Sequence, residues 1–78
     1  MNMLSANNLS TLKPGESAVV SDVTSSGSMR RRLQDIGLIK GAHVTCLQKS
    51  PLGDPTAYLI RGAVIALRSE DSSCVQIQ

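Results

Sequence analysis

Apolar and polar residues alternate along much of the chain with the two-residue period of a β-strand. The clearest case is "AHVTCL", in which Ala42, Val44 and Cys46 fall on one face and His43 and Thr45 fall on the other. A strand of this kind buries one face and leaves the other in solvent. The segment therefore predicts a half-buried strand in the middle of the chain.

Turn residues and apolar runs predict further strands on both sides of this segment. Pro14-Gly15 is a turn dipeptide, because proline fixes its own φ and glycine takes a positive φ, so a strand should follow over Ser17–Val23. Later, "AYLIRGAVIALRS" contains two apolar runs around Arg61-Gly62, the pattern of a β-hairpin whose tip needs glycine. The chain therefore predicts a mainly β domain.

The C-terminal segment predicts one turn of helix and a last strand. The serine and acidic residues of "SEDSS" are typical of a capped first helical turn, and in the following "CVQIQ" Val75 and Ile77 share a face. Short strands with tight turns favour a small β-barrel, because closing the sheet removes its exposed edges. We expect a mainly β fold, a small barrel of about five strands with one short α-helix inserted after the first strand.

The segment "SMRRRLQDIGLIKG" predicts that helix. Ser28 is placed to be its N-cap, and Gly37 is placed to be the left-handed residue that ends it. At about 100° per residue, one stripe of apolar side chains must face the core. The stripe consists of Met29, Leu33 and Ile36, which we assign, with Gly37, to structural roles.

The three consecutive arginines of this helix differ in direction. Arg32 lies near the apolar stripe and should lay its stem over the edge of the core, whereas Arg30 and Arg31 should point outward. Cations near a helix N-terminus oppose the macrodipole, and Asp35 offers Arg31 an ion pair only in the weaker orientation. The outward arginines therefore fit either a solvated helix face or a surface that binds a partner.

Composition restricts the class of partner. The chain has 78 residues, a formal net charge of +2 and one aromatic residue, Tyr58. Single-stranded nucleic acids are usually bound by basic residues interleaved with several aromatic side chains, and the sequence lacks that pattern. Tyr58 itself lies in a predicted core strand, where we expect a packing residue whose hydroxyl reaches the rim. Nucleic acid is therefore not expected as a partner.

Length and apolar runs restrict domain organisation and location. We assign residues 1–78 to one domain, with residues 1–11 as a loosely ordered leader or first turn. The N-terminal segment lacks the basic start and apolar stretch of a signal peptide. No run reaches the roughly 20 apolar residues of a membrane span. We therefore expect a cytoplasmic protein that does not insert into the membrane.

Neither a metal site nor a catalytic site is predicted. Cys46 and Cys74 are too few for a disulfide-rich secreted scaffold, so we expect both to be reduced core residues. His43 and Cys46 lie on opposite faces of a strand and therefore cannot share a metal ion. No nucleophile and base stand at a workable spacing. The sequence thus predicts no metal, no cofactor and no enzymatic activity.

The loop "SPLGDP" is a second candidate surface. Leu52 stands between Pro51 and Gly53 at a predicted loop tip, where an apolar side chain either folds back over the barrel mouth or contacts a partner. Asp54, which precedes a proline, suits turn chemistry because its carboxylate accepts backbone N–H bonds. We add the four residues of this loop to the candidate partner-binding residues.

Several of these segments together resemble one protein family. "LKPGESAVV", "RRRLQDIGLIKGAHV", "SPLGDPTAYLIRG" and "IALR", with the closing "VQI", occur in the order and spacing of the ferrous iron transport protein A (FeoA) family. The resemblance implies a cytoplasmic SH3-like β-barrel with a helix after the first strand. We assign structural roles to Gly41 and Gly62. It also implies a role in bacterial ferrous iron uptake, through the membrane permease FeoB and its cytoplasmic GTP-binding domain.

The leading hypothesis is a non-enzymatic accessory module that docks on the FeoB-type permease through Arg30, Arg31 and the loop Pro51–Asp54. One alternative is a modulator of GTP hydrolysis or nucleotide exchange on the G domain of the permease. Another is a small barrel that binds nucleic acid. A homodimer stays open, since Leu38 and Ile39 after the helix could form an apolar patch.

Overall fold

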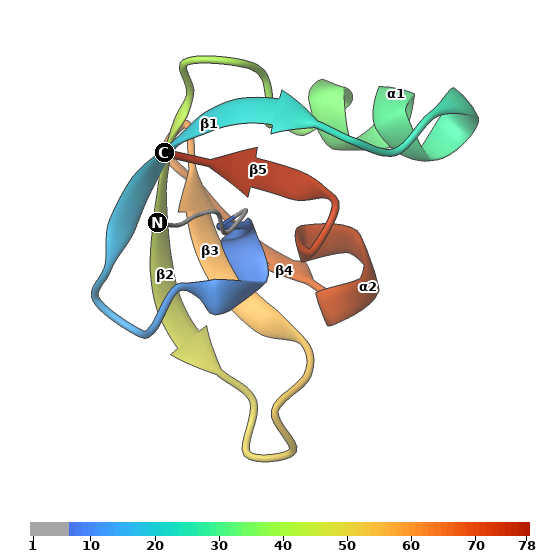
Figure 1. Ribbon diagram of the computed structural model, residues 1–78. Helices are drawn as coiled ribbons and strands as arrows, with labels where there is room; N and C mark the ends of the chain where they lie inside the picture. The colour runs from blue at the N-terminus through green and yellow to red at the C-terminus, as the bar shows by residue number, and fades with distance from the viewer. Residues whose placement is uncertain (1–6) are drawn as a thin grey trace.

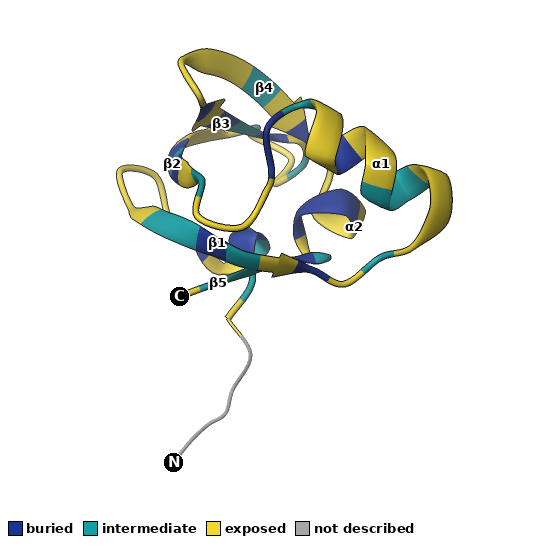
Figure 2. Cartoon of the chain, turned by 90° about the horizontal axis from the view of Figure 1, so that it is seen from above, coloured by how far each residue is buried: buried dark blue, intermediate teal, exposed yellow. Residues whose placement is uncertain are grey.

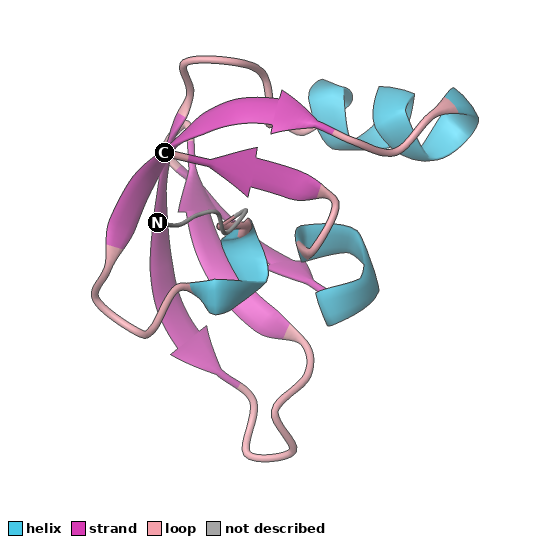
Figure 3. Cartoon of the chain, in the orientation of Figure 1, coloured by secondary structure: helices cyan, strands magenta, loops and turns pink. Residues whose placement is uncertain are grey.

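The computed structural model describes residues 7–78 as a five-stranded antiparallel sheet with short helices (Figure 1; Figure 3). The strands are β1 (Ser17–Val23), β2 (His43–Lys49), β3 (Thr56–Ile60), β4 (Ala63–Leu67) and β5 (Val75–Ile77). The helical elements are the 3₁₀ turn η1 (Leu9–Thr11), helix α1 (Gly27–Asp35) and helix α2 (Ser69–Ser72). The mainly β fold, with a helix inserted after the first strand, is confirmed.

The sheet is not closed into a barrel by strand pairing. Its strand order is β4-β3-β2-β1-β5, so β4 and β5 are the two edges, and the expected closure is wrong. The reason lies in the chain between these two strands. It turns through α2, whose Asp71 and Ser72 are buried, and both α2 and β5 contact η1. Helical turns therefore cover the core where a closed barrel would pair its last strands.

Burial along β2 follows the predicted alternation. Val44 and Cys46 are fully buried, and Ala42 packs against the same core. On the opposite face, His43 is exposed and Thr45 is half-buried. Strand β1 has the predicted bounds and pairs with both β2 and β5. The two-residue period therefore identified the strands and their inner faces correctly.

The hairpin of β3 and β4 turns at the predicted Arg61-Gly62 dipeptide. Ile60 pairs with Ala63, and the two residues between them have positive φ, 51° at Arg61 and 84° at Gly62. Positive φ at both positions is the type I′ geometry, which matches the twist of the flanking strands. Gly62 therefore has the backbone role that was predicted for it.

Helix α1 begins earlier than predicted. Its N-cap is Ser26 rather than Ser28, and Ser26 makes no side-chain capping hydrogen bond. The helix is only nine residues long, so Arg32 falls in its last turn, where the macrodipole favours a cation. The expectation that all three arginines oppose the dipole is therefore wrong for Arg32. The inner stripe is confirmed, since the helix side chains in or against the core are Met29, Leu33 and Ile36.

Helix α1 ends in a Schellman motif at the predicted glycine. The Gly37 N–H donates to the Gln34 carbonyl and the Leu38 N–H donates to the Leu33 carbonyl, each at 3.0 Å. Gly37 takes the left-handed backbone that this motif needs, with φ of 108°. The motif turns Leu38 into the core beside Leu33, so Leu38 is fully buried and the predicted patch keeps only Ile39.

The N-terminal turn η1 is part of the core. Leu9 is fully buried, and its carbonyl accepts a hydrogen bond from the Tyr58 hydroxyl at 3.3 Å. The Asn8 side chain caps the turn by accepting from the Ser10 N–H at 3.0 Å. Of the two alternatives for residues 1–11, a loose leader or a first turn, the structure shows a turn over Leu9–Thr11, and residues 1–6 lie outside the described part. Tyr58 packs as predicted, but η1 covers its hydroxyl, which does not reach the rim.

Candidate docking surface

Arg30 folds back onto the end of β1 and does not extend freely outward as predicted, although its side chain stays 43% exposed. Its guanidinium donates a hydrogen bond to the Val23 carbonyl and lies 3.9 Å from the Asp22 carboxylate. The cause is the early start of α1, because a helix that begins at Gly27 brings its first turn back to the end of β1. Arg30 therefore stabilises the junction between β1 and α1.

Arg32 has a structural role, whereas Arg31 is exposed. The Arg32 Nη2 atom lies 3.0 Å from Oδ2 of Asp71, whose side chain is only 10% exposed, so this pair ties α1 to α2. Arg31 is exposed and takes part in none of the ion pairs within residues 7–78, including the predicted pair with Asp35. Of the three arginines, Arg31 is the one left open to a partner.

We expect Arg32→Gln to lower the free energy of unfolding by about 1 kcal/mol, because it leaves the nearly buried Asp71 carboxylate without its partner. The matched variant Arg31→Gln should change it by less than about 0.5 kcal/mol. Urea denaturation at low and high salt measures both. Equal effects of the two variants would contradict a stabilising role for the pair with Asp71.

The loop between β2 and β3 carries an exposed leucine at its tip. Leu52 is 92% exposed, so it does not fold back over the core. Ser50 holds the turn, since its Oγ accepts from the Leu52 N–H at 3.2 Å and its carbonyl accepts from the Gly53 N–H at 2.7 Å. Pro51 is exposed beside it. Of the two alternatives for Leu52, the structure shows the exposed one.

Asp54 ties this loop to the start of α2. Its carboxylate accepts a hydrogen bond from the Ser69 N–H at 2.8 Å and lies 3.8 Å from the Arg68 guanidinium. The prediction that Asp54 accepts a backbone N–H is confirmed, although the donor lies outside its own loop. Figure 1 places the loop and α1 at opposite ends of the molecule. The helix face and the loop therefore do not form one continuous surface.

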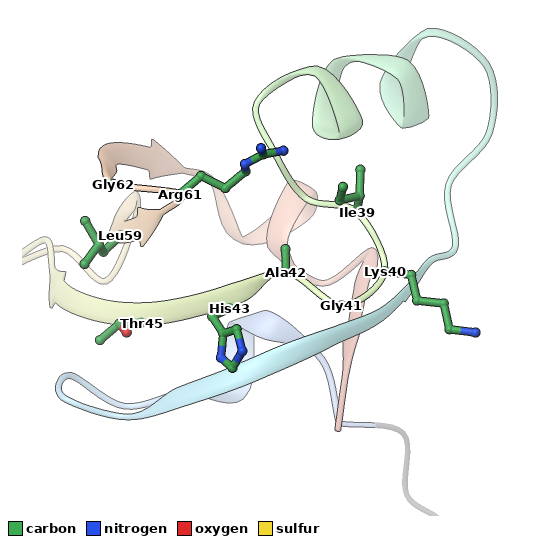
Figure 4. A pocket seen from close by; sticks show the side chains of 9 residues that line it. All are labelled: Ile39, Lys40, Gly41, Ala42, His43, Thr45, Leu59, Arg61 and Gly62. Atoms are coloured by element: carbon green, nitrogen blue, oxygen red, sulfur yellow. The ribbon is translucent and has the colours of Figure 1, made fainter.

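A groove that the sequence did not predict lies on the outer face of the sheet. It has a volume of about 560 Å³ and is lined by the connection from α1 to β2, by β2 and β3, and by the hairpin tip (Figure 4). Thr45 and Leu59, which face each other in the ladder of β2 and β3, lie in this lining. Residues distant in the sequence thus form one concave surface.

The groove combines exposed apolar side chains with basic ones. Ile39 is 41% exposed and Leu59 is 37% exposed. Lys40, His43 and Arg61 supply the basic groups, and the lining contains no acidic residue. In Figure 4, Arg61 extends toward the connection between α1 and β2, whereas Lys40 points away from the other side chains. This chemistry suits a partner surface that is apolar and acidic.

A close contact with Gly37 determines where Arg61 lies. A Cβ atom at Gly37 would come within 2.7 Å of Arg61 Cδ, so the glycine leaves room for the arginine stem. From the sequence, His43 was predicted on the surface and Gly41 in a structural role, but neither was connected with Arg61. The outward face of β2 and the glycine at the hairpin tip were the available indications.

Residues 7–78 contain no group of three or more His, Cys, Asp or Glu side chains that could hold a metal ion. Cys46 is fully buried and Cys74 is partly buried, and both are free thiols. His43 is exposed on the face opposite Cys46, as the strand period predicted. No helix in the described part of the chain is long and apolar enough to cross a membrane.

Two buried titratable side chains, Cys46 and Tyr58, should make the stability of the fold decrease at alkaline pH. Burial raises the pKa of the Cys46 thiol above its ordinary 9.0 and the pKa of the Tyr58 phenol above its ordinary 10.0. The folded state holds both protons more tightly than the unfolded chain does, so this stabilisation is complete below about pH 9 and is lost as pH rises through the folded pKa values. Urea midpoints measured from about pH 7 to pH 10.5 should fall above about pH 9. A double variant, Cys46→Ala with Tyr58→Phe, should show a shallower fall.

The model of the FeoA domain family matches residues 7–78. The chain belongs to the FeoA family. A Porphyromonas gingivalis protein described as an Fe(2+) transport protein A/Fe(2+) transporter FeoB fusion protein is 34% identical over 70 residues. The match covers 90% of this chain and 8% of the fusion protein, so the chain spans a small part of that relative.

Two solved FeoA structures share the fold. FeoA from Chlorobium tepidum is 35% identical with a TM-score of 0.85, over 92% of this chain and 69% of that one. Stenotrophomonas maltophilia FeoA, solved in complex with zinc and described as a procaryotic SH3 domain protein, is 31% identical with a TM-score of 0.84. That match covers 94% of this chain and 91% of the other. The SH3-like architecture of the FeoA domain is therefore confirmed, and the family is linked to ferrous iron transport.

Proposed function

We propose that this FeoA domain is a non-enzymatic cytoplasmic module that docks on a FeoB-type iron permease and regulates its activity. The observation that carries the proposal is the Porphyromonas gingivalis relative, whose description joins FeoA and FeoB in one protein. Fusion of two domains in one chain supports their working together, because a linker keeps each at a high local concentration near the other.

We assign the docking contact to the groove. It is concave, and it presents Ile39 and Leu59 together with Arg61, while Lys40 lies at its rim and points away from them (Figure 4). Exposed apolar area supplies affinity, and the basic groups favour an acidic surface of the cytoplasmic part of the permease. Arg31 and Leu52 remain separate candidates for contact, since they lie on α1 and on the distant loop between β2 and β3.

Co-purification of the FeoA domain with full-length permease in detergent tests the proposal. Lys40→Glu should weaken retention about tenfold, because it places a carboxylate at the rim of the groove, where an acidic partner surface would surround it. Lys13→Glu makes the same charge change at an exposed residue outside the groove and should retain binding. Arg31→Glu and Leu52→Ser test the other two surfaces. Equal retention of Lys40→Glu and Lys13→Glu would contradict docking through the groove.

The regulatory part of the proposal has its own measurement. Adding the wild-type FeoA domain to the permease should change its rate of GTP hydrolysis or of GDP release, and adding Lys40→Glu should change it less. An unchanged GTP rate with intact co-purification would leave docking in place and contradict regulation through the G domain.

A further inference from the structure

Strand β4 is an edge strand that lacks the usual protection of an edge. Its sequence is "AVIAL", and it pairs with β3 on one side only. Natural edge strands are normally protected by a charged side chain, a proline or a bulge, and β4 contains none of these. Val64 is 66% exposed, and Figure 2 shows most of β4 at the surface. Strand β4 is therefore open to pairing.

The hairpin shows which backbone groups face the open side. Ile60 and Ala63 flank a two-residue loop, so they exchange both of their hydrogen bonds. Alternation then points the N–H and C=O groups of Val64 and Ala66 toward the open edge. Among residues 7–78, no loop, cap or turn forms a backbone hydrogen bond with either residue. The edge thus presents two donors and two acceptors in strand geometry.

The pairing of β1, β2 and β3 independently gives the same assignment of the β4 residues whose backbone groups face the open edge. The Cys46 N–H donates to the Glu16 carbonyl at 2.8 Å, so the backbone groups of Cys46 face β1. Tyr58 is opposite Cys46 in the ladder of β2 and β3, and its own backbone groups must therefore face β4. Tyr58 in turn pairs with Ile65, which leaves the residues on either side of Ile65 facing the open edge.

We propose that β4 binds an extended segment of a partner protein as an added β-strand, and that this segment has an apolar centre and acidic ends. The centre is set by the uncharged sequence of β4. The ends are matched to Arg68, which directly follows β4, and to Arg61 at the hairpin tip. In the free domain Arg61 extends toward the connection between α1 and β2, so its guanidinium must turn toward the edge to reach the segment (Figure 4). Arg68 remains 67% exposed in its side chain beside Asp54, so it can reach a second carboxylate. Backbone hydrogen bonds supply affinity in this mode, and side chains supply selectivity.

A second copy of this chain fits the edge less well. An antiparallel pair of β4 strands centred on Ile65 brings Arg61 of one copy close to Arg68 of the other. Like charges at neighbouring cross-strand positions are destabilising. Acidic residues at the ends of a partner segment instead give two favourable pairs. The added strand goes beyond docking through the groove, and it does not depend on which protein supplies the segment.

The test uses a short synthetic peptide of alternating Val and Thr with Glu at each end, and a Lys-ended peptide of the same length. Amide NMR shifts of the labelled FeoA domain should change most at Val64 and Ala66, and exchange of these two amides should slow on binding. The Lys-ended peptide should bind at least about tenfold more weakly, since it places cations beside Arg61 and Arg68.

A proline variant distinguishes backbone pairing at the β4 edge from non-specific hydrophobic binding of the peptide. Ala66→Pro removes one outward donor and keeps the bonds to β3, because proline is tolerated where its missing N–H faced solvent. It should weaken peptide binding about tenfold, while Ala66→Thr, which keeps the donor, should bind like the wild type. If Ala66→Pro does not fold, the amide shift changes of the wild-type domain on peptide binding still test whether the peptide pairs with β4. Three results would each overturn the proposal. They are amide shift changes that are largest outside β4, equal affinities of the Glu-ended and Lys-ended peptides, and formation of a dimer with shift changes at Val64 and Ala66.

Discussion

Replacing Leu9 by alanine should lower the free energy of unfolding by about 2–5 kcal/mol, the usual cost of removing a fully buried leucine side chain from a core. Leu9 has no exposed surface, and its carbonyl accepts the hydrogen bond of the buried Tyr58 hydroxyl. Loss of the side chain loosens η1 and so threatens that hydrogen bond as well. Urea denaturation followed by circular dichroism measures the change.

Leu52→Ala is the matched control, because it removes the same atoms from a side chain that is 92% exposed. It should change the free energy of unfolding by less than about 0.5 kcal/mol. Similar small effects of the two variants would mean that residues 7–11 are a loose leader in solution, which is the other alternative that the sequence left open.

Gly37→Ala should cost about 2–3 kcal/mol of stability, for two separable reasons. The first is backbone strain, because φ at Gly37 is 108°, a conformation that residues with a Cβ rarely adopt. The second is a clash, because the new Cβ would lie 2.7 Å from Arg61 Cδ and 3.2 Å from Ile60 Cγ2. Thermal and urea unfolding measure the total.

Gly41→Ala isolates the first reason. Gly41 has φ of 91°, and nothing lies within 4 Å of a Cβ built there, so this variant should cost only about 1 kcal/mol. In an Arg61→Ala background the cost of Gly37→Ala should fall toward the same value. An undiminished cost in that background would show that the arginine stem is not the obstacle.

Local pattern was enough to predict most of the fold. Three features that depend on neighbouring residues were predicted correctly. They are the strand alternation at Val44 and Cys46, the hairpin at Arg61-Gly62 and the glycine that ends α1. Such features depend on side-chain period and on backbone preference, which a single sequence displays directly.

The errors arose where distant segments meet. Arg30 was expected to point outward on an isolated helix, yet the carbonyl of Val23 and the carboxylate of Asp22 lie within its reach because only residues 24–26 separate α1 from β1. Leu9 looked like part of a leader, because nothing near it in the sequence indicates Tyr58, 49 residues away, as its partner. The helical period predicts the direction of each side chain around the helix axis. It does not predict which residues of another element lie in that direction.

The candidate site was predicted only in part, for the same reason. Leu52 was recognised as a loop-tip residue, and its exposure decided between the two alternatives. The groove was missed because it exists only through the register that sets Thr45 opposite Leu59 and brings Arg61 beside the end of α1. Register between strands depends on the assembled sheet, and the separate segments did not reveal it.

The pairing of β1 with β5 determines when this domain can form during protein synthesis. Val20 and Val23 lie opposite Ile77 and Val75, so β1, which can pair with β2 earlier, gains its second neighbour only after nearly the whole domain has left the ribosome. Contacts between residues so far apart in sequence close late and slow the folding step. A growing chain therefore carries η1 and the β5-facing side of β1 without their last neighbour until β5 emerges, which is the interval in which chaperones can bind nascent FeoA.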